Sequence, residues 1–257
     1  MASLTTLYKD VQFGLVQIAC AIVNFSMRTF SLPHTHLHPE LDYNAFCQCA
    51  SEYTGNFYDF IPQNGGGLVV SFGDLPSTGE VHAINVPCLQ ALVRGLGMEN
   101  PHDLVDLARE INTTLHLLGP RDLCVPWFYA RIDPARRQLQ YVNAGHEPPL
   151  LIRGGTVERL DRTGAALGLS TRGVHRRKTA SIESGDVLAI FSEAVSEETV
   201  RRVVLDNPQA GTAELTERVL EECRGIGQER SFAAVRVLGA GRHPLIEERT
   251  EVELCAA

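Results

Sequence analysis

The stretch Asn143–Leu151, NAGHEPPLL, joins two apolar runs near the middle of the chain. Leu139–Val142 precedes it and Pro149–Ile152 closes it, and the glycine, histidine and proline pair between them are typical of a turn. Further toward the N-terminus, Trp127–Ile132 is another apolar run, and it ends in a turn-forming Asp-Pro-Ala tripeptide at 133–135. The middle of the chain therefore predicts three successive strands joined by short turns.

Outside this region, the apolar pattern predicts three more strands and three helices. The strands are Gly67–Phe72, Val187–Phe191 and Phe232–Leu238, and the helices are Glu80–Gly95, Pro101–Leu115 and Thr212–Arg224. Asn100 is expected to cap the second helix, with Pro101 at its first position, and Pro87 is expected to kink or divide the first. Antiparallel-style groups of strands with helices between them indicate an α/β or α+β fold rather than a regular βαβ alternation.

Composition limits the function classes. The chain has 257 residues, of which 44% are hydrophobic and 21% charged, so wholesale disorder is excluded. Its net charge of −8 argues against a nucleic-acid binder that works by phosphate neutralisation. The seven cysteines are odd in number and include no CxxC pair, which favours reduced thiols and a cytoplasmic location.

The first 40 residues differ from the rest in their sequence pattern. Phe13–Phe25 is almost wholly apolar, but it is shorter than the roughly 20 residues that span a bilayer. We expect a helix that packs on its own domain or forms a homodimer with a second copy, with membrane association as the alternative. The predicted organisation is an extension at 1–40, one domain at 41–240 and a polar tail at 241–257.

Polar and acidic residues stand at the ends of the predicted strands. Asp74 follows the Gly67–Phe72 run, Glu193 follows the Val187–Phe191 run, and Glu229 precedes the last strand. A strand that delivers a carboxylate into a turn is a common way to place an oxygen ligand for a hard metal ion. Each acid taken alone is more simply explained as a turn residue.

Taken in order, these segments resemble a known family. The chain is similar to PPM-type, metal-dependent protein serine/threonine phosphatases of the bacterial SpoIIE/RsbU branch, whose segments read GGDYYDF, GDVSGKG, NAGH-x-PP, YTDGVTEA and DD-x-T. The matching segments here are TGNFYDF at 54–60, GDLPSTG at 73–79, NAGHEPP at 143–149, FSEAVSE at 191–197 and QERS at 228–231. ALGL at 166–169 and SGDVL at 184–188 add support. The resemblance implies an α+β, four-layer αββα sandwich of two antiparallel sheets flanked by helices.

The resemblance also implies a metal centre, and here the motifs depart from the family. The family's aspartates hold two Mn²⁺ or Mg²⁺ ions and a water that attacks phosphoserine or phosphothreonine. The four corresponding positions are Asn56, Asp74, Glu193 and Gln228. Gln228 takes this place if Ser231 stands for the family threonine, and a shift of one residue moves the acidic pair onto Glu229-Arg230.

Two carboxylates therefore stand where the family has four. The candidate metal ligands are Asp74, Glu193, Glu229 and the backbone of Leu75, with Asn56 and Gln228 as degenerate positions and His146 lining the site. The first hypothesis is a regulatory protein with an eroded metal centre that still binds the family's partner, a phosphorylatable anti-sigma-factor antagonist. The second is an active phosphatase acting on that partner, and the third is an oligomerising module built on the N-terminal segment.

Three further groups have simple structural explanations. His34, His36 and His38 resemble a zinc-binding pattern but fit a polar loop between two prolines. Cys47 and Cys49 share one face of a predicted strand and are expected to be core thiols. The basic cluster of Arg172, Arg176, Arg177 and Lys178 is typical of a solvated surface, or of one that meets an acidic partner.

Overall fold

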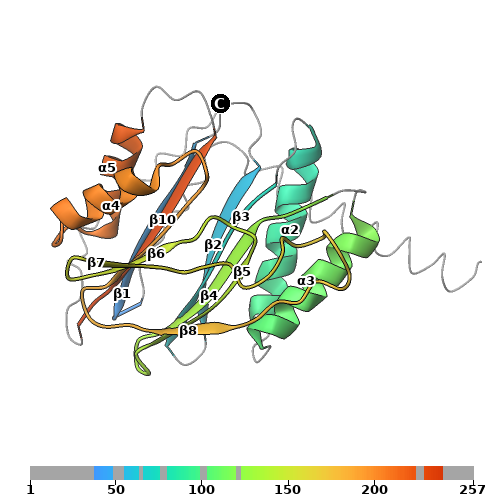
Figure 1. Ribbon diagram of the computed structural model, residues 1–257, viewed down its shortest axis with the longest axis horizontal. Helices are drawn as coiled ribbons and strands as arrows, with labels where there is room; N and C mark the ends of the chain where they lie inside the picture. Colours follow the sequence, from blue (N-terminus) through green and yellow to red (C-terminus); the bar gives the residue numbers. More distant parts are fainter. Residues whose placement is uncertain are drawn as a thin grey trace, which may run out of the picture.

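Two five-stranded antiparallel sheets pack face to face, with helices on both outer faces (Figure 1). The computed structural model describes residues 38–48, 55–63, 66–75, 80–98, 103–119, 123–223 and 229–239. The first sheet has the order β1 (Leu41–Gln48), β10 (Arg230–Val237), β9 (Val187–Phe191), β6 (Leu150–Arg153), β7 (Thr156–Arg159). The second has the order β2 (Asn56–Gln63), β3 (Gly67–Asp74), β4 (Trp127–Asp133), β5 (Gln138–Ala144), β8 (Lys178–Ser181).

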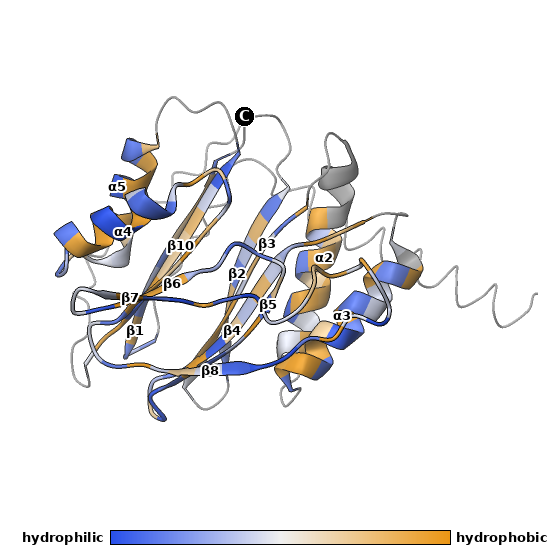
Figure 2. Cartoon of the chain, viewed as in Figure 1, coloured by the Kyte–Doolittle hydropathy of each residue, from blue (hydrophilic) through white to orange (hydrophobic). Residues whose placement is uncertain are grey.

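The helices complete a four-layer sandwich, which confirms the fold class. Helices α4 (Glu197–Asp206) and α5 (Thr212–Glu222) cover the first sheet, while α2 (Glu80–Met98) and α3 (Leu104–Leu118) cover the second (Figure 1). The helices turn their apolar sides toward the sheets (Figure 2). Each sheet is thus buried on both faces along much of its length, which explains why its central strands have continuous apolar sequences.

Side chains of a single strand, β3, pack in two layers of the core. Leu68, Val70 and Phe72 of β3 point into the space between the sheets, whereas Val69 packs in the layer formed with α2 and α3. Successive side chains of a strand point to opposite faces, so a run such as GLVVSF can fill both layers at once.

The two most apolar predicted strands are not neighbours in one sheet. Strand β3 pairs with β2 and β4, while β9 pairs with β10 and β6. They lie in opposite sheets, and their side chains meet across the core. A strand buried on both faces carries no pattern that tells which sheet it joins.

The structure settles where α3 begins and whether α2 is divided. The cap of α3 is Asp103, whose carboxylate accepts a hydrogen bond from the Val105 amide at 2.9 Å, and the helix begins at Leu104. Asn100 and Pro101 lie outside the described residues. Helix α2 continues through Pro87 instead of being divided there. Polar contacts from Gln90 and Arg94 to β2 hold the part of the helix that follows the proline.

Helix α5 is close to its predicted form. It starts at Thr212 and buries Leu215, Val219 and Cys223 against the first sheet. Its first turn is held from outside the helix, since the carboxylate of Asp42 on β1 accepts hydrogen bonds from the Thr212 amide at 2.7 Å and hydroxyl at 2.8 Å. A strand residue thus performs the capping role that a helix usually fills from its own sequence.

Several predictions fall outside the described residues. These are the Phe13–Phe25 helix with its homodimer, His34, His36, Cys49 and the tail at 241–257. His38 is buried, and its Nε2 lies 2.7 Å from the Gly66 carbonyl, so it makes a structural contact. No helix within the described part of the chain is long and apolar enough to cross a membrane.

Candidate functional site

Asn56 and Asp74 face each other where β2 begins and β3 ends. The two strands are antiparallel, so the start of one meets the end of the other. Asn56 is buried, while Asp74 is half-buried. The Asp74 amide donates to the Pro126 carbonyl at 3.1 Å, and the half-buried Cys47 thiol lies 3.8 Å from the Asn56 carbonyl. The backbone around this pair is therefore fixed by its neighbours.

Glu229 reaches the same place from the other sheet. Its Oε2 accepts a hydrogen bond from the Gly55 amide at 3.0 Å, and the Gly55 carbonyl accepts one from the Leu75 amide, also at 3.0 Å. Gly55 thus connects the start of β10 to the end of β3. Glu229, Asn56 and Asp74 come together at one end of the sandwich. The Leu75 amide is engaged, so only its carbonyl is a candidate metal ligand.

Glu193 lies at this end but extends into solvent. It follows Ser192, whose amide donates to the Ser231 carbonyl and whose hydroxyl accepts from the Ser231 amide, both at 3.0 Å. These bonds tie the end of β9 to the start of β10, beside Glu229. The Glu193 side chain itself is exposed. Gln228 lies outside the described residues.

The donor set fits a dinuclear centre poorly. Two divalent ions need several anionic oxygens, and Asn56 offers only a neutral amide. One carboxylate oxygen of Glu229 is already used by the Gly55 amide. Within the described ranges, no group of three or more His, Cys, Asp or Glu side chains is placed to hold a metal ion.

His146 is a buried structural residue. Its Nδ1 lies 2.7 Å from the Glu147 carbonyl, and its ring packs edge-on against Phe72 with centroids 5.3 Å apart. Burial lowers its pKa to about 4, so the imidazole is neutral near pH 7. The ring is therefore part of the core packing beside Phe72.

The NAGH stretch forms a junction with residues 160–168. The Asn143 Nδ2 donates to the Leu160 carbonyl at 3.1 Å, and the Asn143 amide donates to the Thr163 hydroxyl at 2.9 Å. Gly145 has a φ of +76°, and a Cβ there would lie 2.8 Å from the Ala166 amide. Only glycine fits such a place. The sequence predicted a turn in this stretch, but not its contacts with residues 160–168.

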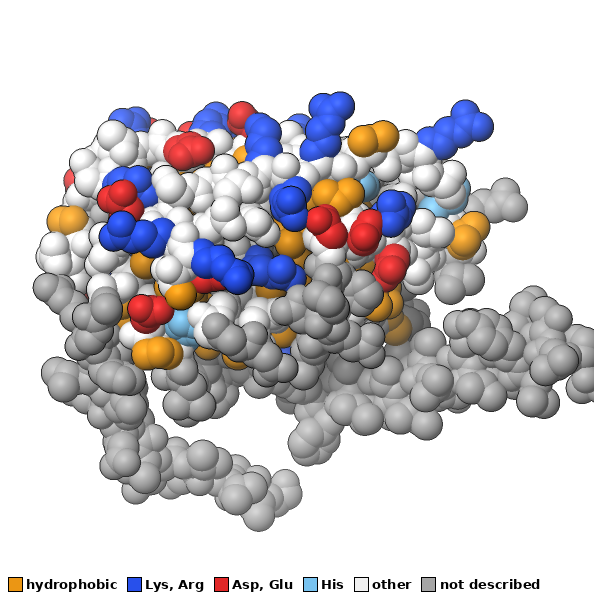
Figure 3. All heavy atoms as spheres, turned by 90° about the horizontal axis from the view of Figure 1, so that it is seen from below, with side chains coloured by type: hydrophobic (Ala, Val, Ile, Leu, Met, Phe, Trp, Pro, Cys, Tyr) orange, Lys and Arg blue, Asp and Glu red, His pale blue; other side chains and the backbone are white. Residues whose placement is uncertain are grey.

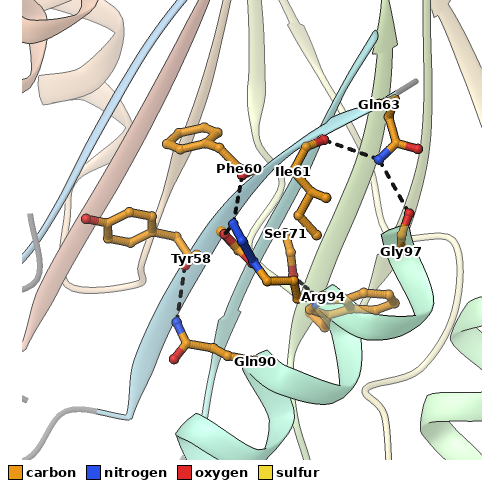
Figure 4. A network of polar contacts seen from close by, with 10 residues as sticks. Tyr58, Phe60, Ile61, Gln63, Ser71, Gln90, Arg94 and Gly97 are labelled. Carbon is orange, nitrogen blue, oxygen red and sulfur yellow. Dashed lines mark hydrogen bonds and ion pairs between the residues drawn. The ribbon is translucent and has the colours of Figure 1, made fainter. Parts of the chain in front are cut away.

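A polar network behind the site positions β2 (Figure 4). Arg94 of α2 donates to both carboxylate oxygens of Asp59, at 2.8 and 3.0 Å. Gln90 reaches the Tyr58 carbonyl, and Gln63 reaches the Gly97 carbonyl. Burial raises the pKa of Asp59 to about 6, although the Arg94 charge and hydrogen bonds pull it down. The aspartate in the quoted TGNFYDF segment was the only sequence signal for this network.

Residues 66–235 match the family model described as Stage II sporulation protein E (SpoIIE). The chain belongs to the SpoIIE family. Two curated relatives from Bacillus subtilis agree with this. The phosphoserine phosphatase RsbU is 22% identical over 170 residues, covering 65% of this chain and 50% of RsbU. The phosphoserine phosphatase RsbP is 24% identical over 202 residues, covering 74% of this chain and 49% of RsbP. The SpoIIE-family chain thus spans about half the length of these relatives.

Solved structures share the fold of this SpoIIE-family chain. The RsbU and RsbW domains of a Mycobacterium tuberculosis protein superpose with a TM-score of 0.72 at 17% identity, covering 79% of this chain and 63% of that one. The PP2C phosphatase domain of Bacillus subtilis SpoIIE gives 0.68 at 15% identity, with 77% and 62% coverage. The catalytic domain of the serine/threonine phosphatase PstP, solved with two manganese ions, gives 0.60 at 15% identity, with 78% and 99% coverage. At these identities, the likeness shows the fold alone.

Proposed function

We propose that this SpoIIE-family domain is a regulatory protein of partner-switching signalling, with an eroded metal centre and weak or no phosphatase activity. The observation that carries the proposal is the pair Asn56 and Asp74. Their register places a neutral amide opposite Asp74, the one aspartate that remains among the four positions where the family has metal-binding aspartates. The proposal includes a domain at 41–240 and a cytoplasmic location, which the odd number of cysteines and the lack of a CxxC pair in the sequence support.

Charge explains why this change matters. Two Mn²⁺ or Mg²⁺ ions bring four positive charges, and in a partly desolvated site each lost carboxylate leaves more of that charge uncompensated. Glu193 is exposed and Glu229 is hydrogen-bonded to Gly55. Neither side chain can replace the negative charge that is missing at Asn56 unless it changes its position. We expect metal binding to be weak.

A domain of this kind acts by binding. The expected partner is a phosphorylatable protein such as an anti-sigma-factor antagonist, which the chain would hold without hydrolysing its phosphoserine. It would then compete with an active relative for the same partner. This role needs the sandwich and the surface around the site, but not the metal.

Active phosphoserine hydrolysis is the second candidate function. Glu229 favours it, because its carboxylate lies beside Asn56 at the same end as Asp74. A site of this kind would use Asp74, Glu193 and Glu229 for one ion, with waters completing its coordination. Mg²⁺ sites in proteins often keep several waters and few protein ligands.

Metal titration of the full chain separates the two candidates. We expect the wild type to bind Mn²⁺ weakly in calorimetry and to release little phosphate from a phosphoserine peptide. The variant Asn56→Asp, Gln228→Asp, Glu193→Asp should bind Mn²⁺ at least about tenfold more tightly per restored carboxylate, which is 1.4 kcal/mol each. Asn44→Asp, which adds a charge on β1, is the matched control and should change nothing.

Strong wild-type turnover would contradict the proposal. If Mn²⁺-dependent hydrolysis is robust, is abolished by a chelator and is lost in Asp74→Ala, the chain is an active phosphatase. If the restored variant binds no more metal than the wild type, the charge argument fails.

A further inference from the structure

The outer surface and the space between the sheets differ as places for a further site. On the face seen from below in Figure 3, positively and negatively charged side chains are mixed, and exposed apolar side chains are scattered among them. Isolated apolar side chains of this kind are normal on a protein surface. Between the sheets, by contrast, polar side chains gather where β1, β2 and β10 come together, namely Cys47, Tyr58 and Ser231.

The Cys47 thiol points into the space between the two sheets, at the end where Asn56 and Asp74 lie. Tyr43 and Ala45, at the preceding alternate positions of β1, belong to the core between the sheets. The sulfur of the half-buried Cys47 lies 3.8 Å from the Asn56 carbonyl on β2, in the opposite sheet. Cys47 therefore joins the two sheets beside the candidate functional site.

A buried hydroxyl lies next to this thiol. Ser231 is directly opposite Cys47 in the antiparallel pairing of β1 and β10. Side chains of such a pair lie on the same face of the sheet, with Cβ atoms about 4.5 to 5.5 Å apart. The Ser231 side chain is fully buried, and its Oγ has no hydrogen-bond partner within the described part of the chain. This hydroxyl carries a desolvation penalty that a polar atom added to the Cys47 sulfur would relieve.

Tyr58 brings a second hydroxyl group to the same space. Its ring points away from α2 and toward the first sheet (Figure 4). Burial, with smaller contributions from the charges of Cys47 and Asp59, raises the pKa of the Tyr58 phenol to about 12. The phenol therefore stays protonated near neutral pH and is a hydrogen-bond donor. Hydroxyl groups from both sheets thus face the region of the Cys47 sulfur.

Two other thiols of the chain have different surroundings. Cys124 is half-buried and Cys223 is buried, and burial raises the pKa of both thiols. Because the thiolate is the nucleophile, a raised pKa lowers the reactivity of a cysteine. Cys47 combines partial exposure with nearby hydroxyl groups that can donate hydrogen bonds to a thiolate or to its oxidised form.

We propose that Cys47 is a peroxide-reactive thiol whose sulfenic acid is held between the sheets by the Ser231 hydroxyl. The Cys47 thiolate attacks one oxygen of hydrogen peroxide, so the S–O bond forms as the O–O bond breaks. The leaving hydroxide takes up the proton that the thiol lost and becomes water. The sulfur is oxidised by two electrons, and the peroxide is reduced by two.

The oxidised sulfur lies where it can act on the candidate functional site. The S–OH group can both donate to and accept from the Ser231 Oγ, which satisfies the buried hydroxyl. The added oxygen lies between β1 and β2, next to the Asn56 carbonyl that the thiol contacts. The proposal is independent of whether the domain hydrolyses phosphoserine, because neither Cys47 nor Ser231 is needed for that step here.

Trapping with dimedone in the full chain tests the reactivity of Cys47. The reduced protein is treated with hydrogen peroxide and dimedone, which forms a thioether with a sulfenic acid and releases water, and the adducts are mapped by mass spectrometry. We expect the adduct at Cys47 to exceed those at Cys124 and Cys223 by at least about tenfold, because their raised pKa values leave less thiolate. Catalase added before the peroxide is the control and should abolish labelling.

Two results of this experiment would overturn the proposal. One is labelling of Cys47 that is no stronger than labelling of Cys124. The other is a disulfide between Cys47 and a second thiol in place of the adduct, because the sulfenic acid would then not be held between the sheets.

The variant Ser231→Ala tests whether the hydroxyl holds the sulfenic acid. The amide and carbonyl of Ser231 bond to Ser192, and alanine keeps both bonds, so the melting temperature should not fall. Cys47 should still react with peroxide, but its sulfenic acid should convert to sulfinic acid about three- to tenfold faster, as expected for the loss of one hydrogen bond. Ser181→Ala, on the exposed strand β8, is the matched control and should change nothing. An unchanged conversion rate in Ser231→Ala would contradict the proposal.

Discussion

The two helical layers of the sandwich are attached to their sheets in different ways. Helices α2 and α3 are joined to the second sheet and its loops by polar side chains, among them Gln90, Arg94 and Asn112, in addition to their apolar faces. Helices α4 and α5 cover the first sheet mainly with apolar residues, apart from the hydrogen bonds of Thr212 at the start of α5 to Asp42 of β1. In this layer, the polar side chains Arg230 and Arg236 of β10 lie beneath the helices.

The difference shows where polar contacts specify position and where they cost stability. The bonds of Arg94 to Asp59 and of Asn112 to its loop satisfy both partners. Arg230 and Arg236 are buried, and each has two side-chain nitrogens without a hydrogen-bond partner. A satisfied polar pair fixes one arrangement, whereas a buried cation that is only partly hydrogen-bonded carries a penalty that the apolar packing must offset.

Apolar packing should support both layers equally. Leu107 of α3 and Leu215 of α5 are both buried, at 2% and 0% exposure. Leu107→Ala and Leu215→Ala should each lower the free energy of unfolding by about 2 to 5 kcal/mol, because each leaves a cavity. Urea unfolding measures both. A loss below about 1 kcal/mol for only one of them would mean that one layer is not part of the cooperative core.

The pH dependence of the free energy of unfolding should reveal the contribution of Asp59, which belongs to the layer of α2 and α3. The folded-state pKa of Asp59 is raised from 3.8 to about 6, so the neutral acid is favoured in the fold. Stability from this group is therefore present at low pH and is lost as pH rises from about 4 to about 6. Relative to Asp59→Asn, the wild type should lose at most about 3 kcal/mol between pH 4 and pH 7.

Unfolding by urea at a series of pH values measures this difference. At pH 7, Asp59→Asn should be close to neutral, because the amide keeps an acceptor for Arg94 while the cost of a buried charge disappears. Asp133→Asn is the matched control, since Asp133 pairs with an exposed arginine. A wild type that gains stability over Asp59→Asn as pH rises would show that the ion pair outweighs burial.

The sequence predicted most strands and the general architecture, but not how strands are shared between sheets. The turn after β4 and the buried face of α5 follow from local patterns, and both are present. The placement of β3 and β9 in opposite sheets does not follow, because both runs are buried on two faces. Local sequence patterns also cannot predict that Asp42 caps α5, since that residue is distant from the helix in sequence.

Part of the geometry of the candidate site follows from the sequence. Strand ends and family motifs identified Asp74 and Glu229, which the structure brings to one end of the sandwich through Gly55. The exposure of Glu193 and the burial of His146 depend on tertiary packing, which a motif does not encode. The Asp59–Arg94 pair depends on the packing of α2 against β2, so the sequence alone did not predict it.

Replacement of Arg236 should produce the smallest effect and the only gain. Burial lowers the pKa of its guanidinium, with Asp42 acting in the opposite direction, and its Nη1 donates to the Pro208 carbonyl at 2.9 Å. Arg236→Met keeps the volume beneath the helices and removes the desolvated charge. The Pro208 carbonyl is in an exposed turn and can bond to water instead. We therefore expect the free energy of unfolding to rise by about 1 kcal/mol.

Two further variants separate charge from volume at this position. Arg236→Ala removes the same charge but leaves a cavity, so it should lower stability. Arg218→Met removes an exposed arginine from α5 and should change stability by no more than about 0.5 kcal/mol. A loss of more than about 1 kcal/mol in Arg236→Met would mean that the bonds to Pro208 and the attraction to Asp42 exceed the cost of burial. In that case, both helical layers would be held by net favourable polar contacts, and the contrast between them would not hold.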